Sequence, residues 1–552
     1  METNTLNVTS EGVALAGSEL KTAETVGRRS VESPVHRTIG AGALSVFNLG
    51  LKIVSNFILI LVALKFLGRE EYGLWILLQS LATYLALSEL GISQTVCNFQ
   101  NVAFARGDYK QVGRILVSTF WLYCLIVAIA AILFSGVVLT QPVNVWFLKD
   151  PGSVSAPKFA MYLFLAGTFA LLRVPLTVFP VTLVGLREVA LRQVLETVSA
   201  ISLLVFTLGA LIAGGKILAL ILATNLAYML AQVLGYALTR TRHPEVRFSL
   251  SLLDKSLMGP IFGNSIFFFL YGLGLLFQRL AGTLIGGKYG ALGDVPALFV
   301  LLTLFRIVGW SLAEIPSQTL QPYVILFSTR GEHDRVVFLA RLCTKLTFAI
   351  GAAYVAGVWI FADMGIRAWL GPGMFLGYGP LICLGVSFLI DILFLSTNNF
   401  MRGLNEHRKL SIVMAGYALL SFTFGVAGAK WWMPNQPLYG LCVGLLVASV
   451  LGQALTLPWI AKAWLRVDWQ AYGGSFLFRP GLSIVFVILA ALFAERSHGW
   501  WRSAGFILVL LGSFSFMSWR FVLDLGERSW LTSRIGLQRL LMRRAPLSDP
   551  MC

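Results

Sequence analysis

Long apolar runs separated by short polar and basic segments recur along most of this 552-residue chain. The stretch that follows Gly68 is typical: GREEYGLW leads into an apolar run in which Glu89 is the only charged residue, and ARGDYKQVGR follows the run. About 20 residues at 1.5 Å per residue are enough to cross the hydrocarbon core of a bilayer. The run therefore predicts a transmembrane helix.

The same criterion predicts about 14 transmembrane helices. They cover residues 41–64, 72–98, 115–140, 158–183, 191–214, 217–239, 257–282, 295–320, 340–362, 373–399, 409–429, 438–461, 479–494 and 503–523. The expected fold class is an all-α polytopic membrane protein, because helices satisfy every backbone polar group within the bilayer.

Short sequence echoes indicate that the two halves of the chain are related. SQT at 93–95 recurs at 317–319, and RGD at 106–108 recurs as RGE at 330–332, both displaced by 224 positions. VGLRE is echoed by RGLNE at a displacement of 218. Internal repeats of this kind are typical of transporters, although a duplicated anchor bundle would show the same pattern. We predict two six-helix repeats around a central cavity, followed by two C-terminal helices.

This organisation divides the chain into six parts. They are a disordered cytosolic tail (1–38), an N-terminal six-helix half (39–239), a basic cytosolic linker (240–256), a C-terminal six-helix half (257–462), two extra transmembrane helices (463–525) and a basic amphipathic cytosolic tail (526–552). Lysine and arginine concentrate on the side of the two termini, and such loops stay in the cytoplasm during insertion. Both ends of the chain are therefore expected to be cytoplasmic.

Composition and charge narrow the function further. Apolar residues make up 57% of the chain and charged residues 12%, too little polar surface for soluble domains. The net charge of +17 lies in loops between apolar runs, which argues against nucleic acid as a partner. The chain has no phosphate-binding loop for ATP, and its histidines fall in the tail and loops. We expect no metal site, no cofactor and no enzyme activity, and leave proton or sodium coupling open.

Charged residues inside predicted spans mark candidate functional positions, because each needs a partner or a wet cavity. Lys52 lies mid-span, with Asn48 and Asn56 one turn to either side on the same helical face. We expect this polar stripe to face a cavity, with a structural ion pair as the alternative. Glu196, near the start of its span, is expected to cap the helix or extend to the surface.

The eighth span carries a similar face, with Arg306, Trp310 and Glu314 at successive turns. Arg173 lies in the fourth span before Pro175, where functional and packing roles are both open. Asp391 is the deepest acid and suits either a coupling site or a structural lock with an arginine.

The candidate cavity and gating residues fall into two groups. Those assigned to a substrate cavity are Lys52, Asn48, Asn56, Arg173, Arg306, Arg279, Gln79, Asn264 and Gln278. Those assigned to coupling or gating are Glu89, Glu314 and Asp391. Because the deep cations outnumber the deep anions, the balance favours an anionic ligand.

The run LGREEYGLWILLQSLATYLALSELGISQTV, with the ARGDYKQVGRIL segment beyond it, resembles polysaccharide-export and O-antigen flippases. These form the Wzx-type branch of the multidrug/oligosaccharidyl-lipid/polysaccharide (MOP) superfamily. The residues that carry the resemblance are Gly68, Tyr72, Gly73, Trp75, Ser80, Tyr84, Leu90, Gly91, Ile92, Gly107 and Asp108.

The resemblance implies a MATE-like fold in the bacterial inner membrane. It implies that the protein moves a lipid-linked oligosaccharide, generally carried on undecaprenyl pyrophosphate, between leaflets by alternating access. The product would feed a surface polysaccharide such as lipopolysaccharide, with membrane lipids and a polysaccharide polymerase or export machinery as partners. A drug/cation antiporter of the same fold and a non-transporting scaffold for polysaccharide assembly are the alternatives.

Overall fold

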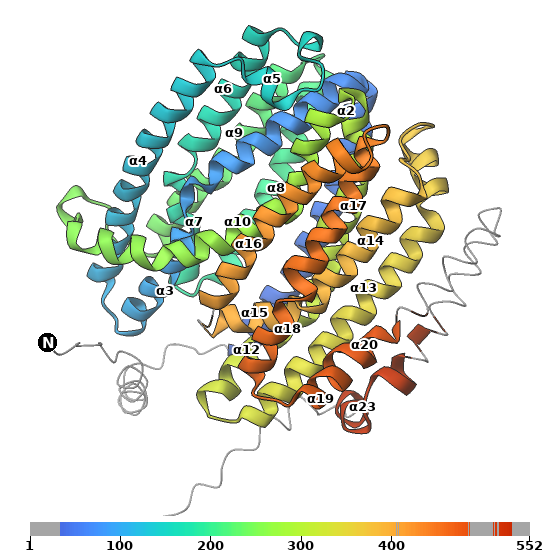
Figure 1. Cartoon of the computed structure of the whole chain (residues 1–552). Coiled ribbons are helices and arrows are strands. Elements are labelled where there is room, and N and C mark those ends of the chain that lie inside the picture. Colours follow the sequence, from blue (N-terminus) through green and yellow to red (C-terminus); the bar gives the residue numbers. More distant parts are fainter. Residues whose placement is uncertain are drawn as a thin grey trace, which may run out of the picture.

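A computed structural model describes residues 34–483 except 405 and 407, together with 485, 512, 514–515 and 518–532. Every regular element in these residues is helical, which confirms the predicted all-α architecture (Figure 1). Eleven helical stretches are long and apolar enough to cross a membrane. The first of them, Phe47–Ala105, contains most of the predicted span 41–64 and all of the predicted span 72–98. The predicted spans 479–494 and 503–523 lie mostly outside the described residues, so the total of 14 stays a prediction.

The first long helix, α2 (Pro34–Leu85), breaks where the sequence predicts one span to end and the next to begin. At Gly68 the backbone has φ of +74° and ψ of 178°, a conformation that side chains with a Cβ rarely adopt. This break separates the predicted spans 41–64 and 72–98.

The second of these spans does not continue as one helix. A 3₁₀ turn, η2 (Ala86–Glu89), follows α2, and Leu90 and Gly91 both have positive φ before α3 (Ile92–Ala105) begins. Glu89 therefore lies at a helix break, where backbone groups freed from the helix are available to side chains.

The remaining helices of the first half follow the predicted order. They are α4 (Tyr109–Thr140), α5 (Val143–Phe147), α6 (Ala156–Leu172), η4 (Pro175–Thr177), α7 (Val178–Gly185), α8 (Val189–Ile212) and α9 (Ile217–Arg242). The predicted span 158–183 is divided between α6 and α7, because Pro175 has no N–H to continue the helical ladder.

Four further short 3₁₀ turns lie between longer helices: η3 (Pro151–Ser153), η5 (Leu250–Leu252), η6 (Lys255–Leu257) and η7 (Leu292–Asp294). The second half and the C-terminal segment contain the other elements. They are α10 (Met258–Tyr289), α11 (Val295–Leu302), η8 (Thr303–Gly309), α12 (Trp310–Thr329), α13 (His333–Leu370), α14 (Tyr378–Leu393), α15 (Leu395–Gly403), α16 (Arg408–Ala427), η9 (Gly428–Trp432), α17 (Pro437–Ser449), η10 (Val450–Ala454), α18 (Leu457–Leu465), α19 (Trp469–Tyr472), η11 (Gly473–Phe478), α20 (Arg479–Gly481), η12 (Ser518–Val522) and α23 (Leu525–Thr532). Five of these short stretches, η8 to η12, are π-helical.

The repeated RGD and RGE motifs form the same turn in the two halves. Gly107 links α3 to α4 and Gly331 links α12 to α13, and both have φ of +71°. The amide of Asp108 donates to the Ala103 carbonyl at 3.0 Å, and the amide of Glu332 makes the equivalent bond at 2.9 Å. The two motifs are therefore similar in backbone geometry as well as in sequence.

The two halves pack against each other at the end of the bundle where α2 bends (Figure 1). One apolar core joins Tyr72 of α2 to Leu298 of α11 and Ile366 of α13. The Phe57 and Trp369 rings lie 4.5 Å apart across this contact. Side chains of both halves thus fill this end, and the cavity described next lies toward the N-terminal end of α2.

Candidate functional site

A cavity of about 480 Å³ lies beside Lys52, between helices of the two halves. Its lining comes from α2, α7, α8 and α9 of the first half and from η8 and α12 of the second. The residues that line it are Leu49, Lys52, Ile53, Ser55, Asn56, Leu59, Pro180, Arg192, Leu195, Glu196, Ser199, Ala200, Leu203, Tyr228, Ala231, Gln232, Ile307 and Ser311. Ligand-binding cavities commonly have volumes of roughly 300–1,000 Å³.

Lys52 lines this cavity and also makes an ion pair, so the structure combines the two alternatives that its sequence position left open. Its Nζ lies 2.8 Å from Glu196 Oε2, and 48% of the side chain stays exposed. Arg192 Nε lies 3.4 Å from the other oxygen of Glu196. One carboxylate thus bridges two cations, and the charged lining carries a net positive charge.

The two asparagines on either side of Lys52 have different roles. Asn56 lines the cavity. Asn48 is buried, donates to the Gln193 carbonyl at 2.9 Å and accepts a hydrogen bond from the Thr197 hydroxyl. Asn48 therefore fastens α2 to α8 and does not contact the cavity, which corrects its predicted position. It positions Lys52 opposite Glu196.

Arg173 lies behind the cavity rather than in its lining. At the C-terminus of α6, its guanidinium stacks over the Tyr228 ring with 4.7 Å to the ring centroid. Tyr228 lines the cavity, so the ring separates Arg173 from that space. Glu89, at the break before α3, lies within electrostatic range of Arg173 and Arg192. The cation and acid thus support one side of the cavity.

The predicted cavity position of Arg306 is wrong. Its side chain is 1% exposed and pairs with Asp391 of α14, which is fully buried. Arg306 Nη2 also donates to the Ser387 hydroxyl at 2.6 Å. The next residue, Ile307, lines the cavity, so Arg306 projects from η8 toward α14 instead. A buried carboxylate without a cation would be very unfavourable, and Arg306 supplies that cation.

Further hydrogen bonds complete the buried Arg306–Asp391 pair. Gln453 Nε2 donates to Asp391 Oδ1 at 2.5 Å, and the Tyr417 hydroxyl lies 3.4 Å from the same oxygen. Ser449 contacts Ser387 at 2.6 Å and Tyr417 at 3.0 Å. The network ties η8 to α14, α16 and α17, which matches the structural lock considered for Asp391.

A second polar cluster in the C-terminal half contains Arg279 and Glu314. The Arg279 guanidinium lies over the Trp310 ring at 5.7 Å, and Asn399 Nδ2 lies 3.3 Å from Glu314 Oε1. Arg402, at the end of α15, donates to Asn399 and stacks over the Tyr271 ring. Neither Arg279 nor Glu314 lines the cavity beside Lys52.

The other predicted amide residues are dispersed. Gln79 donates to the Thr224 hydroxyl at 2.8 Å and joins α2 to α9. Asn264 lies exposed on α10. Gln278 is buried, and its amide has no hydrogen-bond partner among the described residues. Of the five amide residues assigned to the substrate cavity, Asn56 alone lines it.

Arg192, Glu196 and Tyr228 are the site residues that sequence reasoning missed. Arg192 and Glu196 are four residues apart on α8, a spacing that places them on one helical face. Glu196 does not act as a cap, because both of its oxygens face cations. The i,i+4 spacing of a cation and an acid near the start of one predicted span was the available signal.

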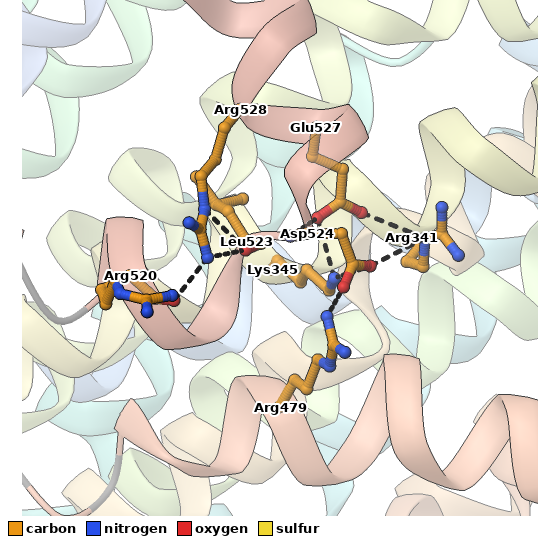
Figure 2. A network of polar contacts seen from close by, with 8 residues as sticks. All are labelled: Arg341, Lys345, Arg479, Arg520, Leu523, Asp524, Glu527 and Arg528. Carbon is orange, nitrogen blue, oxygen red and sulfur yellow. Dashed lines mark hydrogen bonds and ion pairs between the residues drawn. The ribbon is translucent and has the colours of Figure 1, made fainter.

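A further buried charge cluster joins the C-terminal segment to α13 (Figure 2). Lys345 and Glu527 are both 0% exposed, and Lys345 Nζ lies 2.8 Å from Glu527 and 3.0 Å from Asp524. Arg341 Nε lies 3.0 Å from Glu527, and Arg479 pairs with Asp524. The sequence analysis did not identify this cluster.

The local sequence of α23 explains how its acids are presented. The Asp524 amide donates to Glu527 Oε2 at 2.8 Å, so the third residue of the helix caps its start. Arg528 donates to the Leu523 carbonyl at 2.8 Å and also to Arg520 (Figure 2). The expected amphipathic tail at 526–552 thus begins with a docked helix, and residues 533–552 lie outside the described part.

Comparisons with known proteins identify the fold. No protein-family model matches the sequence, and no curated protein does either. Solved structures do match. An inward-facing multidrug resistance MATE family transporter of the MOP superfamily has a TM-score of 0.56 at 13% identity, over 77% of this chain and 98% of that one. An outward-facing transporter of the same description has a TM-score of 0.55 at 14% identity, over 78% of this chain and 96% of that one.

A third similar structure differs in the character of its pocket. It is a MOP superfamily transporter from Pyrococcus furiosus, described by the reverse polarity of its binding pocket, which suggests a different function for that protein. The TM-score is 0.53 at 15% identity, over 78% of this chain and 96% of that one. Together these matches show that this multi-pass membrane protein has the fold of MATE transporters of the MOP superfamily.

Proposed function

We propose that the protein moves an anionic lipid-linked oligosaccharide across a membrane by alternating access. The observation that carries the proposal is the cavity between the halves, where Lys52 and Arg192 share the single carboxylate of Glu196. A phosphate group can replace or join that carboxylate, because charge-assisted hydrogen bonds to phosphate are strong and Arg binds it through two parallel bonds. A cation exporter would require the opposite excess of charge.

The cavity offers different chemistry to the two parts of such a substrate. Lys52 and Arg192 would bind the phosphates, while Asn56, Gln232 and the Tyr228 hydroxyl would hydrogen-bond the sugars. The lipid chain would stay in the bilayer, since removing it from an apolar environment has no compensating interaction in a polar cavity. Arg306 has no part in this binding step; it holds the second half together.

The rest of the transport cycle is also part of the proposal. The protein would act in the bacterial inner membrane with both termini in the cytoplasm, and a polysaccharide polymerase or export machinery would use the product. Glu89 and Glu314 are candidates for coupling to protons or sodium. The membrane potential provides about 2.3 kcal/mol per charge per 100 mV.

The test compares Lys52→Ala and Arg192→Ala with Lys65→Ala, which removes a charge from α2 outside the cavity lining. Each variant is expressed in the bacterium that produces the polysaccharide, membrane abundance is measured, and the surface polysaccharide is quantified. Loss of surface polysaccharide in the first two variants alone is expected. Normal export from abundant Lys52→Ala and Arg192→Ala proteins would refute the proposal.

Export of cationic drugs is the second candidate, favoured by the similarity to multidrug resistance MATE structures. In that case Glu196 would bind the cation, and Lys52 would oppose it. Glu196→Gln would then abolish drug resistance, and Lys52→Ala would increase it. The flippase proposal predicts unchanged drug susceptibility for both variants.

A further inference from the structure

A second cavity, of about 290 Å³, lies far from Lys52 in the sequence, where α9 ends and the linker toward α10 begins. Aromatic rings form much of its lining: Phe179 lies 4.8 Å from Tyr236 and 5.6 Å from Phe248, measured between ring centroids. Among the residues that the structure describes, the charged ones in this lining are Arg240 and Arg247, and none is an acid. We call this space the linker cavity.

The two arginines of the linker cavity carry unbalanced charge. Arg240 Nη1 lies 3.1 Å from the Tyr236 hydroxyl, and both arginines are exposed. Within the part of the chain that the structure describes, neither guanidinium makes an ion pair. The neighbouring acids Glu188 and Glu245 face His243 instead. The cavity therefore presents free positive charge, unlike the Lys52 site, where Glu196 already partners both cations.

The position of the linker cavity indicates which kind of anion its arginines would bind. α9 is long and apolar enough to span a membrane and ends at Arg242, so the cavity lies at the level where lipid headgroups begin. Phe248, 41% exposed, lies at this level, where aromatic side chains favour the boundary between chains and headgroups. Basic pockets between helix ends of this kind suit acidic lipid headgroups.

We propose that the linker cavity binds the headgroup phosphate of an anionic phospholipid from the adjacent leaflet. Arg240 belongs to α9 and Arg247 to the linker, so one phosphate held by both would join the linker to the first half. The linker already has two attachments there: its Asp254 amide donates to Ser118 Oγ at 2.9 Å, and the Arg247 backbone lies against Gly113. A bound lipid would strengthen the attachment of the segment that connects the two halves.

Native mass spectrometry of the full chain, titrated with dioleoylphosphatidylglycerol, tests this proposal. Arg240→Gln/Arg247→Gln is compared with Arg242→Gln/Lys255→Gln, which removes the same charge from the same segment but spares the cavity lining. An arginine that contacts the headgroup of an anionic lipid contributes about fivefold in affinity, and a cation outside the cavity makes no such contact with the lipid bound there. We expect the dissociation constant to rise by roughly 20-fold or more in the first double variant and to stay unchanged in the second.

Two further measurements keep the result interpretable. Ser249→Trp, which places a large ring in the cavity lining and keeps both arginines, should also weaken binding, and it serves if the double variant does not fold. Equal weakening in both double variants would overturn the proposal, because it would show diffuse attraction to the basic segment. Displacement of the lipid by free glycerol 1-phosphate at similar concentration would also overturn it, since the ligand would then be a soluble phosphate.

Discussion

The two halves of the chain each contain a cation deep in a predicted span, and the structure gives the two cations opposite surroundings. Lys52 in the first half has a partly exposed side chain, a partner acid and a cavity beside it. Arg306 in the second half is buried against Asp391 and a set of hydroxyl and amide groups. One half therefore offers a cation to a ligand, and the other uses a cation for its own packing.

This difference shows that a charge inside a membrane span has two distinct explanations. The energetic cost of burial requires a partner in either case. When the partner is a fully buried acid whose other oxygen accepts hydrogen bonds, as Asp391 is for Arg306, the pair is structural. When the partner is shared between two cations and partly exposed, as Glu196 is, positive charge remains for a ligand.

The largest expected effect comes from separating the locked pair. Arg306→Met leaves the Asp391 carboxylate buried without a cation, which costs about 3–5 kcal/mol of folding stability. Membrane abundance and the melting temperature of purified protein should both fall. Arg306→Met/Asp391→Leu removes both charges and should recover most of the loss. A wild-type melting temperature for Arg306→Met would contradict the structural role of Arg306 that sets it apart from Lys52.

The C-terminal charge cluster provides a second locked site with a more local effect. Lys345→Met leaves Glu527 buried, but Arg341 still contacts it, so we expect a loss of roughly 2–3 kcal/mol, below the loss of about 3–5 kcal/mol for a buried acid left without any cation. Amide exchange should rise in residues 518–532 before it rises in α13. Lys345→Met is compared with Arg335→Met on the same helix, whose i,i+3 pair with Glu332 is partly exposed, at 33% and 30% of the two side chains. Unchanged exchange in 518–532 would contradict the docking role.

The RGD and RGE turns have similar sequences, and substituting their glycines tests whether the two turns contribute equally to stability. Gly107→Ala and Gly331→Ala each place a Cβ at φ of +71°, where no atom of the described residues, apart from the chain neighbours, lies within 4 Å. The cost is therefore conformational, about 1–2 kcal/mol at either position. Thermal unfolding should show nearly equal losses. A clear difference between the two variants would mean that the turns do not share a role.

Lys52 should show the smallest effect on stability. Its ion pair is partly exposed, and such pairs contribute about 0–1 kcal/mol. Lys52→Ala should therefore accumulate in the membrane and melt close to the wild-type temperature, in contrast to Arg306→Met. A large loss of stability would place Lys52 with the structural charges.

The sequence predicted the helical architecture well because each span is a long apolar run and Gly68 or a proline marks many of its breaks. The repeated turns were also predictable, since Gly107 and Gly331 are needed at positive φ. The sequence did not show which face of a helix lines a cavity. Lys52 and Arg306 look equivalent in sequence, and the partners that separate them, Glu196 and Asp391, lie 144 and 85 residues away.

Transfer of a labelled substrate between leaflets tests the central claim most directly. Wild-type, Lys52→Ala and Lys65→Ala proteins are reconstituted in liposomes with undecaprenyl pyrophosphate carrying a fluorescent sugar, and movement is followed by quenching from outside. We predict transfer by the wild-type and Lys65→Ala proteins and at least a tenfold slower rate for Lys52→Ala, about 1.4 kcal/mol of lost interaction. Equal rates for all three folded proteins would contradict the claim that the Lys52 cavity binds the phosphate.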